Sequence, residues 1–307
     1  MNWLSLVVIS ALSGSAGVYV DNYVSDYYFK GRDSVSQKLF YAAGCIVFSL
    51  SIMLFTGFDF LGLDINVPLL LILSGICSSI AEIPYYRALE IDDSTNLGIF
   101  MQISPVLYLI LGWIFLHESI SLSQMAALAI IMAAPILIIF NTRKRNRKTK
   151  LRAVFCAFLY VIIEVIGSLI FVKESAEAVS IVSSISLLIL GNGIGNVVIM
   201  ALKPKWVKRF KNVMKKSKKR VLFPLIWSFI FSAICTFAYR TVLILAPSVA
   251  LASALLDSAG PISMFFMGII LTLLWPKLGR EKLNKKSILV HLEATALVVI
   301  GIVLLQF

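Results

Sequence analysis

The sequence predicts an all-α membrane protein of ten transmembrane helices, arranged as two inverted five-helix repeats. Hydrophobic residues make up 59% of the 307 residues and charged residues only 14%. The apolar residues come in blocks of about twenty, the length that spans ~30 Å of hydrocarbon. Each block must be helical, because a backbone in lipid has to satisfy its own hydrogen bonds. The blocks cover residues 3–20, 36–57, 67–89, 94–116, 122–140, 152–172, 178–202, 221–245, 248–275 and 287–306.

The basic residues gather in the connections on one side of these blocks. The positive-inside rule makes that side cytoplasmic and places both termini outside. The net charge of +12 is therefore a sign of topology, and nucleic acid is not an expected partner. The basic connections contain Lys30, Arg32, Lys38, residues 143–152, residues 203–220, Lys277, Arg280, Lys282, Lys285 and Lys286.

Segment 203–220 has a pattern of its own. Trp206, Phe210, Val213 and Met214 recur at helical spacing, with lysines between them. This pattern predicts a short amphipathic helix on an anionic leaflet. The alternative is a solvated basic loop.

The chain divides near its midpoint at a basic linker, residues 141–151, which separates residues 1–140 from residues 152–307. Five helices on each side would force the two halves into opposite orientations, as in inverted-repeat transporters. The halves also share local features at matching places. Tyr86-Arg87 has a counterpart in Tyr239-Arg240, and each pair is followed by a proline in the next block, Pro105 or Pro261. Such prolines often mark a broken or kinked helix beside a cavity.

The first half resembles a known transporter repeat. Its signature residues are Tyr86-Arg87-Ala88-Leu89, then Ser104-Pro105, then Leu116-His117-Glu118-Ser119-Ile120-Ser121 and Gln124. This run is similar to the EamA repeat of the drug/metabolite transporter superfamily. The second half departs from the repeat, with Pro276-Lys277 where the Leu-x-Glu is expected. The resemblance implies secondary transport of small organic solutes without ATP.

Three carboxylates lie well inside predicted helices, and such groups are functional candidates by default because they are costly in lipid. They are Glu164, Asp257 and Glu82, and Gln102 occupies the place that matches Asp257 in the first half. A carboxyl in a low-dielectric environment can exchange protons near neutral pH, or neutralise a cationic solute. The alternative is a carboxyl paired with another side chain to fix helix packing, with Arg87 as the partner of Glu82.

Other polar residues are further candidates for a solute pathway. Asn192 and Asn196 lie one turn apart, beside a GxxxG pattern at Gly191 and Gly195 that permits close helix contact. Tyr86 is an aromatic candidate. The arginines that follow the two tyrosines, at 87 and 240, are interpreted as interfacial anchors.

Enzymatic chemistry and cofactors are not expected. The sequence has no HExxH motif and no Gly-rich phosphate loop, and it has only two histidines. Its four cysteines fall inside apolar blocks without CxxC spacing, which indicates packing roles. They are Cys45, Cys77, Cys156 and Cys235.

Together these patterns predict a multi-pass transporter of the cell membrane. It would move a small organic metabolite or drug by alternating access, with proton coupling through Glu164. A non-transporting scaffold or a lipid-handling protein of the same fold is the alternative. The expected partners are a small-molecule substrate and the lipid bilayer, and the expected state is a monomer or homodimer.

Overall fold

A computed structural model describes residues 2–29, 34–91, 103–117, 121–127, 129–130, 133, 147–176, 178, 180–274 and 285–304. All regular secondary structure in these residues is helical. The elements are α1 (Trp3–Tyr28), η1 (Ser34–Gln37), α2 (Lys38–Thr56), η2 (Asp59–Gly62), α3 (Asn66–Ile91), α5 (Ser104–Leu116), α7 (Arg147–Ser175), α8 (Ile181–Leu202), α9 (Pro204–Leu245), α10 (Val249–Leu274) and α11 (Lys285–Leu304).

Seven helices in the described part of the chain are long and apolar enough to cross a membrane. They lie in α1, α2, α3, α7, α8, α9 and α10, where the sequence predicted spans. The predicted span 94–116 is described only from residue 103 onward, and much of the predicted span 122–140 lies outside the described residues. The first helix is longer than predicted, because α1 continues past residue 20 to Tyr28.

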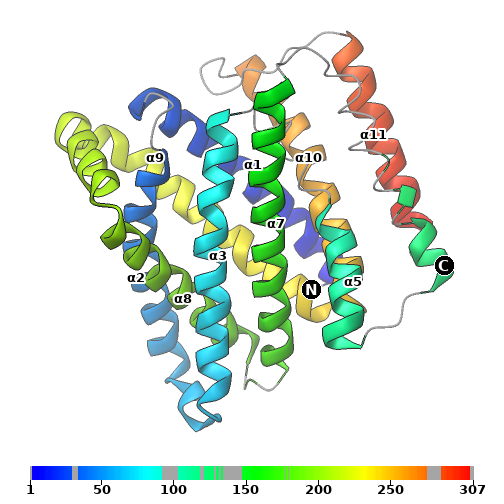
Figure 1. Cartoon of the computed structure of the whole chain (residues 1–307), viewed down its shortest axis with the longest axis horizontal. Helices are drawn as coiled ribbons and strands as arrows, with labels where there is room; N and C mark the ends of the chain where they lie inside the picture. The colour runs from blue at the N-terminus through cyan, green and yellow to red at the C-terminus, as the bar shows by residue number, and fades with distance from the viewer. Residues whose placement is uncertain are drawn as a thin grey trace.

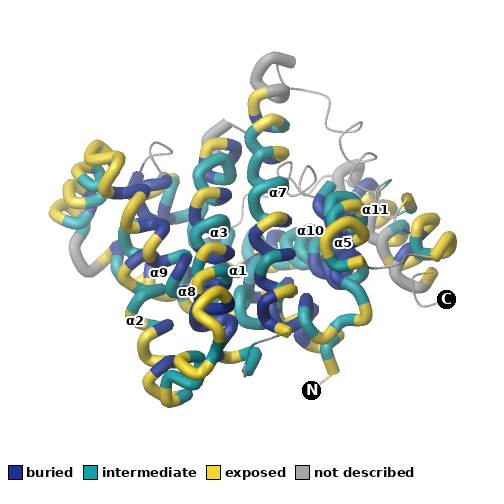
Figure 2. Tube along the Cα trace, turned by 60° about the horizontal axis from the view of Figure 1, so that its bottom comes forward, coloured by how far each residue is buried: buried dark blue, intermediate teal, exposed yellow. Residues whose placement is uncertain are grey.

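Large apolar side chains cover the outer faces of the bundle. Phe55 is 92% exposed, and Leu54 and Leu273 are each 70% exposed. Exposed residues lie along the outer side of α2 in Figure 2, while buried residues line the faces between helices. Apolar surface on this scale is a liability in water and is suited to lipid. With the seven apolar spans, it marks a multi-pass membrane protein.

The helices pack in a specific set of neighbours (Figure 1). α1 packs against α9 and α10, while α3 packs against α7 and α8. α2 packs against α8, and α5 packs against α7 and α10. Segments far apart in the sequence are therefore interleaved, and the two ends of the chain do not form separate bundles.

Glycines allow α3 and α8 to meet backbone to backbone. A Cβ on Gly191 would overlap the carbonyl group of Ile72, and a Cβ on Gly75 would overlap the carbonyl oxygen of Leu188. A Cβ on Gly195, one turn after Gly191, would overlap Ser79, two turns after Ile72, so the contacts advance along both helices together and α3 and α8 run parallel. The close contact expected at Gly191 from the GxxxG pattern is confirmed.

The basic segment 203–220 is not a separate helix. It forms the first part of α9, a single helix of 42 residues. Its apolar residues pack on the protein: Trp206 is 7% exposed and lies in one buried cluster with Tyr86, and Val213 lies in another with Phe29. Arg209 Nη2 donates to the carbonyl of Phe29 at 2.9 Å. The amphipathic pattern is thus satisfied by the ends of neighbouring helices, and Lys205, Lys208 and Lys211 remain exposed.

Replacement of Gly191 by Ala tests the α3–α8 contact. The added methyl has no room against the Ile72 carbonyl, and overpacking costs roughly 1–3 kcal/mol. We expect Gly191→Ala to lower the midpoint of thermal unfolding of the purified protein in detergent. Gly260→Ala is the matched control, because a Cβ there meets nothing within 4 Å. Equal effects of the two substitutions would contradict the packing described here.

Candidate functional site

A buried ion pair joins three helices in the middle of the bundle. Arg240 of α9 is 3% exposed, and its Nη2 donates to Glu164 Oε1 of α7. Its Nη1 donates to Ser168 Oγ, also from α7, and its Nη2 lies 3.1 Å from Ser78 Oγ of α3. One guanidinium therefore holds α3, α7 and α9 together.

The local sequence explains how α7 offers two partners to one arginine. Glu164 and Ser168 are four residues apart, so they lie one above the other on the same face of the helix. A guanidinium has five donors in a planar fork, which suits a carboxylate and two hydroxyls at once. Removing one partner of such a buried pair typically costs ~3–5 kcal/mol, because the other charge is left unpaired.

Aromatic rings surround the ion pair. The Arg240 Cζ lies 5.5 Å from the ring centre of Phe171 and 5.6 Å from that of Tyr239. The Tyr239 hydroxyl is 3.5 Å from the hydroxyl of Tyr108 on α5. Cation–π contact favours a guanidinium in this position. The ion pair therefore lies beside aromatic rings of α7 and α9.

Asp257 of α10 forms a second polar contact, with α5. Ser104 Oγ donates to Asp257 Oδ2, and Ser253 Oγ donates to the same oxygen at 3.0 Å. Ser104 begins the described part of α5, so Pro105 stands in the first turn of this helix, where the missing N–H costs little. Gln102, the expected counterpart of Asp257, lies outside the described residues.

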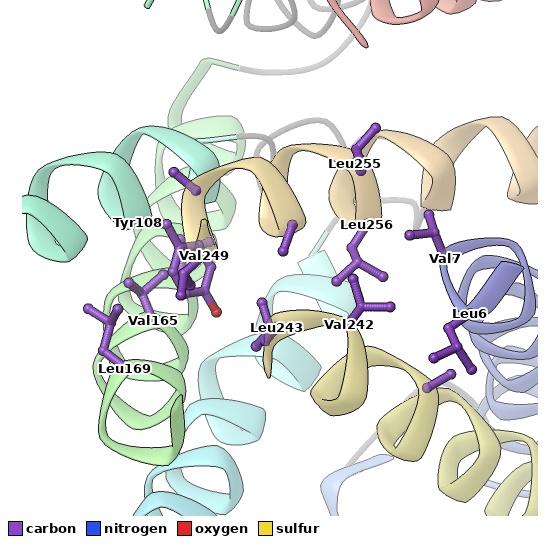
Figure 3. Packing of buried hydrophobic residues seen from close by; sticks show 14 residues of the cluster. Leu6, Val7, Tyr108, Val165, Leu169, Val242, Leu243, Val249, Leu255 and Leu256 are labelled. Atoms are coloured by element: carbon purple, nitrogen blue, oxygen red, sulfur yellow. The ribbon is translucent and has the colours of Figure 1, made fainter. Parts of the chain in front are cut away.

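An apolar core adjoins both polar contacts. Figure 3 shows Val242 facing Leu256 and Leu6, with Tyr108, Val165 and Val249 gathered where α5, α7 and α10 meet. These side chains come from α1, α5, α7, α9 and α10. The residues labelled in Figure 3 thus pack together the helices that carry the arginine and the two carboxylates.

A second charged cluster lies nearer the basic end of the bundle. The Lys38 ammonium forms an ion pair with Glu82, and its side chain is only 6% exposed. Its Nζ lies 4.9 Å from the ring centre of Tyr41 and 5.2 Å from that of Tyr86. Tyr41 also donates to Asp21 of α1 at 2.8 Å. The cluster joins the ends of α1, α2 and α3.

Several expectations about pairing were wrong. Arg240 is not an interfacial anchor but the buried partner of Glu164. Glu82 pairs with Lys38, not with Arg87, whose guanidinium lies over the ring of Trp206 instead. Both carboxylates therefore adopt the paired alternative that the sequence left open.

Asp21 and Lys38 were missed as site residues. They lie close to the helix connections, where charges are read as topology signals. Their burial depends on how α1, α2 and α3 are rotated, which single-sequence patterns do not reveal. The one available clue was that Lys38 stands three residues before Tyr41, whose ring could shield a cation.

The two asparagines lie in a different part of the bundle. Asn196 Nδ2 donates to Asn192 Oδ1 at 2.8 Å, and Cys45 Sγ lies 3.8 Å from the same oxygen. The asparagine pair lies within α8, and the cysteine contact joins it to α2, beside the glycine-mediated packing. α10 continues as one helix through Pro261, so the expected break at this proline is not present.

The family comparison bears on the half of the chain that supplies Ser78, Glu82 and Tyr86. The model of the EamA-like transporter family matches residues 1–140. This family is part of the drug/metabolite transporter superfamily, so the resemblance drawn from Tyr86 through Gln124 is confirmed. The EamA-like half contributes α1, α2, α3 and α5 to the bundle.

The fold of the whole chain is also found among solved structures. One crystal structure, described only as that of a protein, superposes with a TM-score of 0.61 at 13% sequence identity. The match covers 96% of this chain and 95% of the other. At this identity the likeness concerns the fold alone, and it extends past the EamA-like half. No curated protein matches the chain significantly.

Arg240→Met should expose the role of the ion pair. The substitution leaves the Glu164 carboxylate without its partner, and we expect a loss of about 3 kcal/mol of stability, read as a lower midpoint of thermal unfolding. Arg87→Met is the matched control, since Arg87 also follows a tyrosine but is exposed. We expect a change under about 1 kcal/mol there. A control as damaging as Arg240→Met would contradict a special role for the buried pair.

Proposed function

We propose that this protein is a secondary transporter that moves a small organic metabolite or drug across the cytoplasmic membrane by alternating access. The observation that carries the proposal is the buried ion pair between Glu164 and Arg240, surrounded by aromatic rings. The match of residues 1–140 to the model of a transporter family supports it. No step of the proposal requires a cofactor or a catalytic residue.

The proposed architecture is ten transmembrane helices in two inverted repeats, residues 1–140 and 152–307, joined by the basic linker 141–151. The helix neighbours support it. In the proposed repeats α1 corresponds to α7 and α9 corresponds to α3. The contact between α1 and α9 then has its counterpart in the contact between α7 and α3, and both are present. If α10 corresponds to α5, the contact between α1 and α10 likewise has its counterpart in the contact between α7 and α5. Such matched contacts are what an internal two-fold axis produces.

Two glycine contacts match in the same way. A Cβ on Gly14 of α1 would lie 3.0 Å from Cys235 Sγ of α9, and a Cβ on Gly167 of α7 would lie 2.9 Å from Cys77 Cβ of α3. The two cysteines then occupy equivalent places in the proposed repeats. Five residues after them stand Glu82 and Arg240, so equivalent positions would carry opposite charges. This register differs by five residues from the Tyr-Arg correspondence that was expected from sequence.

The chemistry of the site suits a charged organic solute. A solute anion could take the place of Glu164 at the guanidinium, or a solute cation could take the place of Arg240 at the carboxylate. Either exchange breaks the Glu164–Arg240 ion pair, which weakens the link between α7 and α9 and so couples binding to helix movement. Phe171, Tyr108 and Tyr239 would contact the apolar part of the solute. Asp257 is the next candidate for solute or proton binding.

The alternative is a non-transporting scaffold or a lipid-handling protein of the same fold. A scaffold gains little from an ion pair in its core, because replacing such a pair by well-packed apolar residues is often neutral or stabilising. The cost of burying Arg240 and Glu164 is better explained by a bound solute than by stability. This favours the transporter.

Solute uptake into proteoliposomes tests the function. Metabolite classes are first screened by thermal shift, since a ligand stabilises the folded protein that binds it. We expect Glu164→Gln to remove uptake of the identified solute, because the amide cannot hold the charge that the solute exchanges with. Glu293→Gln is the matched control, because it makes the same change on the exposed face of α11.

Two results would count against this account. Wild-type uptake in the Glu164→Gln variant across a range of external pH would remove Glu164 from the mechanism and leave Asp257 as the candidate. Lipid scrambling by the purified protein, with no uptake of any solute class, would support the lipid-handling alternative.

Cysteine labelling tests the proposed orientation. Lys208 is exposed on the basic part of α9, and Asp64 is exposed at the opposite end of the bundle, before α3. In a background without the native cysteines, we expect a membrane-impermeant reagent added to intact cells to label a cysteine at 64 but not at 208. The opposite pattern would invert the orientation.

A further inference from the structure

The carboxylate of Asp21 is held by hydroxyls from three other helices. Tyr41 of α2 donates to Oδ1 at 2.8 Å, and Ser228 of α9 donates to the same oxygen. Tyr86 of α3 lies 3.5 Å from Oδ2. This side chain plays no part in the Glu164–Arg240 site, yet it is among the most completely hydrogen-bonded carboxylates in the described part of the chain.

The charges around Asp21 do not balance. Lys38 is paired with Glu82, so Asp21, Lys38 and Glu82 together carry a formal charge of −1 at neutral pH. An uncompensated charge that is buried away from water is costly. Uptake of one proton makes the three groups neutral without moving any helix.

The same cluster contains an unsatisfied acceptor. Gln37 is fully buried, and its Nε2 donates to the Tyr86 hydroxyl at 3.1 Å. Its Oε1 is buried and has no hydrogen-bond partner. Buried acceptors are normally satisfied, so an exception calls for an explanation. The network around Gln37 and Tyr86 therefore lacks one donor.

We propose that Asp21, Lys38 and Glu82 form a proton-binding site that is separate from the solute site at Arg240. The proposal rests on the proposed transport function and moves its proton coupling from Glu164 to this cluster. The three groups interact closely, so the proton belongs to the cluster as a unit rather than to one oxygen.

α3 connects the two sites. Ser78, Glu82 and Tyr86 are spaced by four residues and lie on one face of this helix. Ser78 accepts from Arg240, Glu82 pairs with Lys38, and Tyr86 donates toward Asp21. Proton uptake at one end of this row changes the electrostatic potential at the other end. Because α3 carries residues of both sites, a movement of this helix would affect both.

The groups that face the cluster come from every helix packed around it. α2 contributes the titratable groups Lys38, Tyr41 and, farther off, Cys45. α3 contributes Glu82 and Tyr86, and α9 contributes the hydroxyl of Ser228. From α7, the charge of Glu164 also acts on Glu82, although Arg240 offsets it.

Infrared difference spectroscopy of the purified protein in lipid, titrated with protons alone, tests the proposal without any solute. We expect the wild type to show the band of a buried carboxyl group that gains a proton as the pH falls, and Asp21→Asn to lose it. Asp26→Asn is the matched control on the same helix, because Asp26 is exposed, and it should keep the band. Glu164→Gln should keep it too.

A wild type without this band, or an Asp21→Asn variant that retains it, would overturn the proposal. Loss of the band in Glu164→Gln alone would assign the proton to the solute site instead. If Asp21→Asn does not fold, Ser228→Ala decides, because it keeps the carboxylate and removes one donor. We then expect the pH midpoint of the band to rise by about one unit at unchanged amplitude, because a carboxylate with one donor fewer binds a proton more readily. An unmoved midpoint would contradict the proposal, whatever the uptake assay shows.

Discussion

The buried guanidinium of Arg240 is the constraint on which the arrangement of the central helices depends. A charge at this depth in a membrane protein has to be paired, and its partners are Glu164, Ser168 and Ser78. These residues come from α7 and α3, so the position and rotation of both helices relative to α9 follow from one side chain. The aromatic rings beside it then shape what else can bind there.

Small residues make this polar centre compatible with close helix packing. Gly75 and Gly191 let α3 and α8 approach at backbone distance, while Gly14 and Gly167 admit cysteine side chains from α9 and α3. Helices in lipid associate through such close contacts rather than through a hydrophobic driving force. The glycine contacts thus fix one face of α3 against α8. On the same helix, Ser78 contacts Arg240 and Glu82 pairs with Lys38.

Much of the fold could be predicted from sequence, because the length and hydropathy of a segment determine whether it spans a bilayer. The spans at α2, α3, α8 and α10 were predicted close to their actual limits, and the family resemblance was visible in the residues from Tyr86 to Gln124. The pairing of charges could not be predicted. Hydropathy gives the depth of a residue in the membrane, but not the direction its helix face points.

That distinction explains the particular errors. Arg240 stands five residues before the end of α9, which by depth alone is typical of an interfacial anchor, but the rotation of α9 directs it inward. Lys38 was counted with the connections, whereas it is the first residue of α2 and is buried between two tyrosines. Glu164 and Glu82 were correctly identified as unusual, and their partners lay on other helices.

Exchange of the two central charges tests the account most directly. Glu164→Arg and Arg240→Glu each place two like charges together at membrane depth, and each should reduce the yield and thermal stability of the purified protein. The account predicts that the double exchange recovers most of this loss, because the opposite charges face each other again and the hydroxyls of Ser78 and Ser168 can donate to the new carboxylate. A double variant as unstable as the worse single variant would show that the pair does not hold α7 to α9.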